Sequence, residues 1–317
     1  MDVTSVGMAA GFVGLGAGVV IIDDNSLAQA TLGNVSQARD VAVKSSAIRT
    51  FSELTGQAAV GAIGAGVTFT RLNIHGGSSA RVNDGAVIGN VTAVRSLSVE
   101  ASSKIAAKVS TVAVSAGIGA VNVNFAELNA DPTISATIGA RAQIKVTGKV
   151  EILAETFFDN RATTFGVSAG GLAVGVSKTQ VSVAPTQTAS IGSQANIAAS
   201  ELTMRAGNVV GNGDYDAQVK ATGSAGALVG ITSTSSKVTN NSKAKTFIGD
   251  AAVVAVTGAV TISAINNTRQ KAEANSNSGG LVAAGIATAS TNSDTRSEAY
   301  LGQNVTLAGR AAGISGG

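Results

Sequence analysis

The chain of 317 residues contains 39 glycines, two prolines and no cysteine, and only 13% of its residues are charged. A hydrophobic content of 44% with so few charges excludes a disordered tail, and the lack of cysteine excludes a disulfide scaffold, a zinc finger and an iron–sulfur protein. The net charge of +3 is too small to indicate a nucleic-acid partner, so we expect none.

The chain begins with an apolar segment, 7–22, that is interrupted by five glycines. A secretory signal peptide requires a basic region before its apolar segment, whereas the only early charge here is Asp2. A membrane-spanning helix requires about 20 strongly apolar residues. Because the segment meets neither requirement, we expect no membrane insertion. Similar segments recur along the chain, so we expect residues 1–317 to be one continuous domain and an internal fragment of a longer protein.

A four-residue motif (a small residue, any residue, Ile or Leu, then Gly) recurs in six copies spaced 50 to 57 residues apart. Its Ile or Leu residues are Leu32, Ile88, Ile138, Ile191, Ile248 and Leu301, and its glycines are Gly33, Gly89, Gly139, Gly192, Gly249 and Gly302. The intervals between these glycines are 56, 50, 53, 57 and 53 residues. Alternating apolar residues follow most copies, as at Val150, Ile152 and Ala154, and this period of two indicates a strand with one buried face.

A second marker keeps the same period. In each repeat one window ahead of the motif contains no Asp, Glu, Lys or Arg; the six windows are 3–22, 54–70, 109–126, 162–177, 221–236 and 274–293. One window precedes each copy of the motif, and Ala, Gly, Val and Ser dominate all six. The alternation changes phase at glycine pairs such as Gly170-Gly171, which is typical of strands joined at corners. Helical repeats are disfavoured because no stripe with a period of 3.6 residues persists.

The two markers predict an all-β fold, a parallel β-helix (β-solenoid) built from degenerate repeats of about 54 residues. With about 18 to 27 residues per coil, each repeat would contain two or three coils stacked at about 4.8 Å. The chain would then form a rod of about 12 to 17 coils and about 55 to 80 Å. We expect the six Ile and Leu residues of the motif to lie along one line.

The charge-free windows allow two interpretations. If their outer faces align, they form an uncharged stripe of Ala, Gly and Ser that would support lateral self-association of neighbouring molecules. Alternatively, they face the core, where small side chains let two backbone walls approach closely. Ala173 and Gly175 distinguish the interpretations, because they belong to the stripe in the first and to the core in the second.

Segments such as 243–250, followed by alternation over 256–264, resemble the repeats of giant bacterial surface proteins, the leukotoxin-type and filamentous-haemagglutinin-like adhesins. The resemblance extends over essentially the whole chain. It implies a secreted, extracellular β-solenoid stalk at the cell surface that acts in attachment, or as a spacer, and contacts an unknown host or surface ligand. It implies no catalytic residues and no cofactor.

Acidic residues lie close together in the sequence at five places: Asp23/Asp24, Glu127/Asp131, Glu151/Glu155, Asp214/Asp216 and Asp294/Glu298. Glycoside hydrolysis requires two placed carboxyl groups. The five pairs occupy different repeat positions, so we interpret them as solvated surface charge and predict no catalytic site. A polysaccharide-active β-helix enzyme is the alternative. It would usually expose aromatic rings for sugar stacking, whereas this chain has no Trp and only two Tyr.

The segment 211–216 is the most metal-like part of the chain. Asn212, Asp214 and Asp216 alternate with other residues and offer oxygen ligands of the kind that Ca²⁺ prefers. The pattern occurs once, so we predict a polar loop without a metal and keep a calcium site as the alternative.

A third class of function is an ice-binding solenoid, which would carry a regular Thr-x-Thr ladder. The pairs Thr68/Thr70 and Thr232/Thr234 are isolated and do not recur in phase with the repeat.

Overall fold

The computed structural model describes residues 1–92, 94–209 and 215–317, and within them the chain is all-β, without an α-helix. All pairing between strands is parallel, in sheets of 12, six and five strands. The 12-stranded sheet contains β1 (Asp2–Ala10), β2 (Val13–Asp24), β4 (Asp40–Val60), β5 (Ile63–Ile74), β8 (Ser96–Ala130), β11 (Lys149–Val183), β14 (Glu201–Asn208), β15 (Ala217–Asn240), β18 (Ala259–Asn266), β19 (Gln270–Gly279), β20 (Val282–Ser293) and β23 (Ala311–Gly316). The six-stranded sheet contains β3 (Leu27–Leu32), β6 (Gly77–Val82), β9 (Thr133–Ile138), β12 (Thr186–Ile191), β16 (Lys243–Ile248) and β21 (Arg296–Leu301). The five-stranded sheet contains β7 (Val87–Ile88), β10 (Gln143–Lys145), β13 (Asn196–Ala199), β17 (Val253–Val256) and β22 (Thr306–Ala308).

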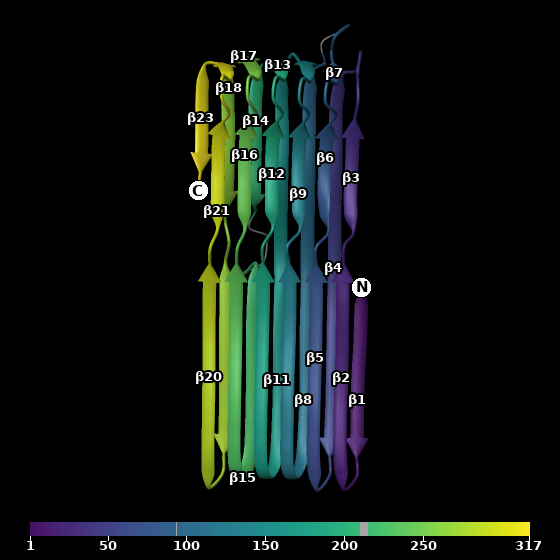
Figure 1. Cartoon of the computed structure of the whole chain (residues 1–317), viewed down its shortest axis with the longest axis vertical. Coiled ribbons are helices and arrows are strands. Elements are labelled where there is room, and N and C mark those ends of the chain that lie inside the picture. The colour runs from purple at the N-terminus through teal and green to yellow at the C-terminus, as the bar shows by residue number, and fades with distance from the viewer. Residues whose placement is uncertain (93, 210–214) are drawn as a thin grey trace.

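One coil, meaning one complete wrap of the chain, is seen most simply from β8 onward (Figure 1). The first part of β8 descends to a sharp bend at 117–118, and the second part ascends from it. The ascending chain continues through β9, turns at the top and passes through the short β10 before β11 descends again. We call the two parts of the long strands the descending and ascending arms, and the bend between them the tip. The longest axis of the molecule runs along these arms and not along the direction in which the coils stack.

The register shows that one repeat makes one coil. Val150 of β11 lies beside Leu97 of β8 and Leu202 of β14, which are 53 and 52 residues away along the chain. The prediction of two or three coils per repeat is therefore wrong, although parallel stacking in an all-β chain is compatible with a β-solenoid. The six strands of the second sheet mark six layers, which span about 24 Å at 4.8 Å per step. The predicted rod of 12 to 17 coils is also wrong. Strands such as β4, with 21 residues, are longer than the short strands that the prediction assumed, so each coil uses more of the chain.

The motif residues form one column with a single exception. Leu32, Ile138, Ile191, Ile248 and Leu301 share a register line, but the position between the first two is filled by Val82. Ile88 instead pairs with Ile144 of β10 in the five-stranded sheet. The expectation that Ile88 and Gly89 belong to this line is wrong, because Ala80-Arg81-Val82-Asn83 is the equivalent segment and lacks the glycine.

The repeated glycine has a packing role at the turn that follows this column. A Cβ atom on Gly192 would lie 2.5 Å from the backbone nitrogen of Ala140 in the coil before it, and one on Gly249 would lie 2.7 Å from that of Ser193. The turns therefore nest, each against the turn of the preceding coil. Two residues after each of these glycines the backbone adopts a left-handed conformation, with φ of 59° at Gln194 and 54° at Ala251.

The interior changes in character along the coil. Between the three sheets in the upper half it is an aliphatic core, containing large and fully buried side chains such as Ile138, Ile152 and Leu202. A second apolar cluster, which includes Ile105, Leu128 and Phe158, fills the middle of the arms. Toward the tip the two walls come closer together, and the buried residues become small and polar.

Candidate functional site

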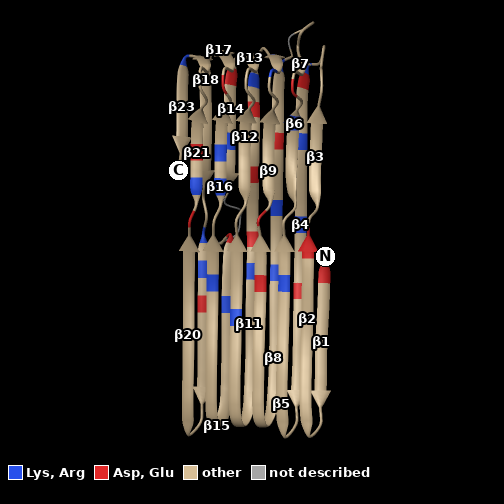
Figure 2. Cartoon of the chain, viewed as in Figure 1, with Lys and Arg blue, Asp and Glu red and all other residues tan. Residues whose placement is uncertain are grey.

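The six charge-free windows all map to the tip and to the parts of both arms beside it. The bends lie near the centres of the windows, as at 61–62 within window 54–70 and at 117–118 within window 109–126. Figure 2 shows the consequence, because the lower part of the molecule carries neither blue nor red segments. The windows therefore form one continuous charge-free region across all six coils.

Small hydroxyl and amide side chains fill the interior of this region. Asn122 Nδ2 donates a hydrogen bond of 2.7 Å to Ser168 Oγ of the next coil. Thr164 and Thr179 face each other across the two walls at 2.8 Å, and Gln57 Nε2 donates to Ser115 Oγ at 3.4 Å. These groups are hidden from solvent, so the hydrogen bonds compensate part of the cost of removing them from water.

The two Thr-x-Thr pairs belong to this interior. Thr68, Thr70, Thr232 and Thr234 are all buried. Thr68 pairs with Asn124, and Thr70 with Thr55 across the walls. They therefore do not form an exposed ladder that could contact ice.

The exterior of the same region is apolar. The outward side chains of the ascending arms, counted from the tip, form three rows: Val13, Ile63, Gly119, Leu172, Val229 and Val282; Leu15, Ala65, Val121, Val174, Ile231 and Ala284; Ala17, Val67, Val123, Val176, Ser233 and Ile286. We call these three rows the apolar face. Large aliphatic side chains in it are substantially exposed, among them Leu15, Ile63 and Leu172. The usual arrangement of apolar residues inside and polar residues outside is thus reversed near the tip.

This reversal decides between the two interpretations of the windows. Ala173 and Gly175 point inward and are buried, so they are part of the interior and not of an exposed stripe. The uncharged surface is nevertheless present. Its outward residues on the ascending side are mainly Val, Leu and Ile instead of Ala, Gly and Ser. Alternation alone does not specify which set faces outward, which is why the sequence did not identify the apolar face.

The predicted acidic pairs are dispersed over the walls, and most are engaged with basic neighbours. Glu127 forms an ion pair with Arg71 of the preceding coil at 2.8 Å, and Asp131 contacts His75 at 2.5 Å. Further ion pairs are Glu151–Lys149, Glu155–Arg205 and Glu298–Arg296. Within the described residues, no three Asp, Glu, His or Cys side chains gather into a group that could hold a metal ion.

Of the three candidate calcium ligands, Asn212 and Asp214 lie outside the described residues. Asp216 is buried and accepts a hydrogen bond of 2.7 Å from the backbone nitrogen of Arg269. Burial raises the pKa of its carboxyl group, and the contact with Arg269 partly opposes this effect.

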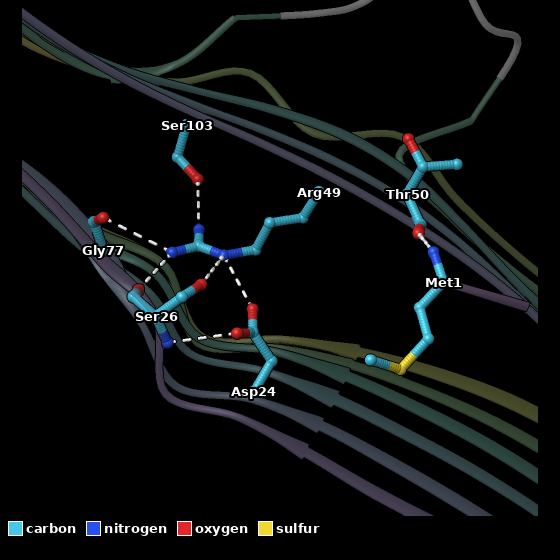
Figure 3. Close-up of polar contacts among 7 residues, drawn as sticks. All are labelled: Met1, Asp24, Ser26, Arg49, Thr50, Gly77 and Ser103. Atoms are coloured by element: carbon cyan, nitrogen blue, oxygen red, sulfur yellow. Dashed lines mark hydrogen bonds and ion pairs between the residues drawn. The ribbon is translucent and has the colours of Figure 1, made fainter.

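A polar cluster that the sequence analysis did not identify surrounds Arg49 (Figure 3). The Arg49 side chain points inward and is only 5% exposed, in the register column that Ile105 occupies in the next coil. Its guanidinium forms an ion pair of 2.7 Å with Asp24 and donates to the carbonyl oxygen of Ser26 at 2.5 Å and to Ser103 Oγ at 3.1 Å. The cluster joins the bend between β2 and β3 to the opposite wall, so its geometry is structural. A single Arg in an otherwise apolar column is the sequence signal that could have indicated it.

Two aromatic rings stack on the outer surface of β16 and β21. The ring centroids of Phe247 and Tyr300 are 5.3 Å apart, and the Lys245 ammonium lies 5.0 Å and 5.2 Å from the two centroids. The rings occupy equivalent positions in neighbouring coils, so the stack follows from the parallel register.

No family model, curated protein or solved structure matches this chain. In its described part, the chain contains no helix that is long and apolar enough to cross a membrane.

Proposed function

We propose that this chain is a β-solenoid segment of a non-catalytic stalk, part of a secreted bacterial surface protein that acts in cell-surface attachment or as a spacer. The observation that carries the proposal is the uniform register: successive coils pair with each other in parallel from β1 to β23. An architecture in which every layer repeats the one before it is suited to bearing load and setting a distance, because stability is distributed over neighbouring layers.

Side chains reinforce this connection between coils. Arg95 forms a bidentate contact with Asp40 of the preceding coil, and its hydrogen bonds lower the pKa of that carboxyl group. Lys44 forms an ion pair of 2.9 Å with Glu100, which links the same two coils. Several acidic residues thus link neighbouring layers, while others pair within one strand, as Glu151 does with Lys149. The links between layers support a structural role over the alternative of a polysaccharide-active enzyme.

Pulling the chain from its two ends in a single-molecule force experiment tests the load-bearing part of the proposal. We expect stepwise unfolding in which each step releases one coil, since successive layers are separate units of about 53 residues. The expected contour-length increment is about 190 Å per coil at about 3.6 Å per residue. Release of the whole chain at low force in one step would contradict a load-bearing stalk.

Attachment and catalysis are tested together with beads coated with the chain. We expect coated beads to be retained on host-cell monolayers under flow more strongly than beads coated with the heat-unfolded chain. The same preparation is incubated with a panel of polysaccharides and assayed for reducing ends, where we expect no release. Sugar release would overturn the proposal in favour of the enzyme. Loss of retention with intact force steps would restrict the function to a spacer.

A further inference from the structure

We propose that the apolar face is the contact surface of a homodimer, in which the ascending arms of two chains pack face to face. Of its 18 positions, 16 carry Val, Leu, Ile or Ala, and the other two are Gly119 and Ser233. Exposed apolar surfaces of this extent mark interaction sites in soluble proteins. The proposal adds an assembly to the stalk and does not depend on whether the stalk is adhesive.

The shape of the face fits a second sheet. The ascending arms of β2, β5, β8, β11, β15 and β20 pair in parallel, and they lie side by side in the lower part of Figure 1. Two such faces can interdigitate at the usual sheet-to-sheet distance of about 10 Å. Six strands at about 4.8 Å and three rows at about 6.7 Å, extended by a fourth row, give about 600 to 750 Å² per copy. The pair would bury about 1,200 to 1,500 Å² in total, which lies within the range of stable protein interfaces.

The next two rows of outward side chains, the fourth and fifth counted from the tip, form a rim of the kind that protein interfaces have. The fourth row begins with Val19, Phe69 and Phe125 and continues with Lys178. In the fifth row, Arg71 and Glu127 pair with each other at 2.8 Å. An apolar surface with charged groups along the edge away from the tip fits a protein partner.

The two sides of the tip differ in the last two coils, and this difference favours a second copy over a lipid layer. In the first four coils the descending side is apolar too, with Met8, Leu54 and Phe165 exposed. On the descending arms of the last two coils, the outward residues include Thr222, Ser224, Asn275 and Asn277. Immersion of the tip in hydrocarbon would bury both sides and leave these polar groups without partners, at a large cost. A face-to-face dimer buries only the ascending side.

The test compares two double variants with the full chain. Val121→Glu with Val174→Glu places charges at the centre of the apolar face, on two neighbouring coils. Val114→Glu with Val167→Glu makes the same changes on the descending side of the same coils. The pairs are matched in exposure, since Val121 is 41% and Val114 is 38% exposed and the other two valines are both half-buried. Sedimentation velocity from low to high micromolar concentration gives the mass, and far-UV circular dichroism reports folding.

We expect the unmodified chain and the Val114/Val167 variant to sediment at twice the 31.0 kDa chain mass. The Val121/Val174 variant should remain folded and dissociate about 100-fold more readily, because four charges per dimer lose their water. A monomeric unmodified chain would overturn the proposal, as would equal weakening by both variants. Continued association of the Val121/Val174 variant would also overturn it and indicate pairing at the open sheet ends instead. Flotation of a monomeric chain with phosphatidylcholine vesicles would assign the face to lipid.

Discussion

Gly192 illustrates how a single residue sets the spacing of the coils. Its Cα faces the turn of the preceding coil, and an added Cβ would meet the backbone of Ala140 at 2.5 Å. The clash involves backbone atoms that cannot rotate away, so adjustment requires the two turns to separate. The sequence motif predicted the importance of this glycine, but its physical reason became visible only when the coils were placed in register.

The Gly192→Ala substitution should therefore lower the free energy of unfolding by about 1 to 3 kcal/mol. Gly226→Ala is the matched control, since Gly226 is exposed and a Cβ there would have no neighbour within 4 Å. We expect the control to change stability by less than about 0.5 kcal/mol. Urea denaturation followed by circular dichroism measures both, and similar losses in the two variants would contradict the nesting of the turns.

Glu53 is the residue whose ionisation should matter most for stability. It points inward between the walls, is 2% exposed, and stands in a register column with Val3 and Val109. Burial raises the pKa of its carboxyl group from 4.5 to about 7, with a smaller effect of the N-terminal ammonium in the opposite direction. The folded state therefore holds the Glu53 proton more tightly than the unfolded state does.

From this shift we predict a loss of stability with rising pH. The contribution of Glu53 is fully present below pH 4.5 and is lost as the pH rises to about 7. A difference of about 2.5 pKa units corresponds to about 3 kcal/mol at most. Glu53→Gln should remove this dependence and be more stable than the unmodified chain at pH 8. Parallel curves of stability against pH for the two proteins would show that the Glu53 pKa is not raised.

At the scale of the elements, the sequence predicted the positions of the strands well, but not which of their side chains face inward or which strands pair. Alternation located the arms of β8 and β11, because a period of two follows directly from the geometry of a strand. It could not show which set of residues faces inward near the tip, where Thr, Asn and Ser lie inside and Val and Leu lie outside. Ile88 was assigned to the wrong column because a four-residue motif carries less information than the pairing of whole strands.

The bend between β2 and β3 is held to the opposite wall by one side chain, that of Arg49. Removal of the Arg49 guanidinium would leave the Asp24 carboxylate, which is 17% exposed, without its charged partner. We expect Arg49→Met to cost about 3 to 5 kcal/mol of stability. Arg161→Met should cost less than about 1 kcal/mol, since Arg161 and Asp159 form a solvent-exposed pair on one strand. Thermal denaturation of both variants makes the comparison, and equal shifts in Tm would argue against a structural role for the Arg49 cluster.

For the whole molecule, the repeat length was readable from the sequence and the number of coils was not. The corner predicted at Gly170-Gly171 is the bend at the tip, but the strands on its two sides are long arms and not the short strands that were predicted. A long, thin coil of about 53 residues is possible here because small residues inside the tip let the walls approach closely. Because no large side chains separate the two arms near the tip, the coil there consists of two sheet faces, whereas its upper half has three. The charge-free periodicity was thus a correct signal of the repeat and an incomplete guide to its shape.

The opposite polarity of the two halves of each coil implies that they respond differently to temperature. The upper half is stabilised mainly by burial of Ile, Leu and Val, a contribution that weakens on cooling. The interior of the tip relies instead on contacts between hydroxyl and amide groups, whose strength does not depend on the ordering of water around hydrocarbon. Cold should therefore loosen the upper half before the tip, so that one continuous strand contains a cold-sensitive and a cold-resistant portion.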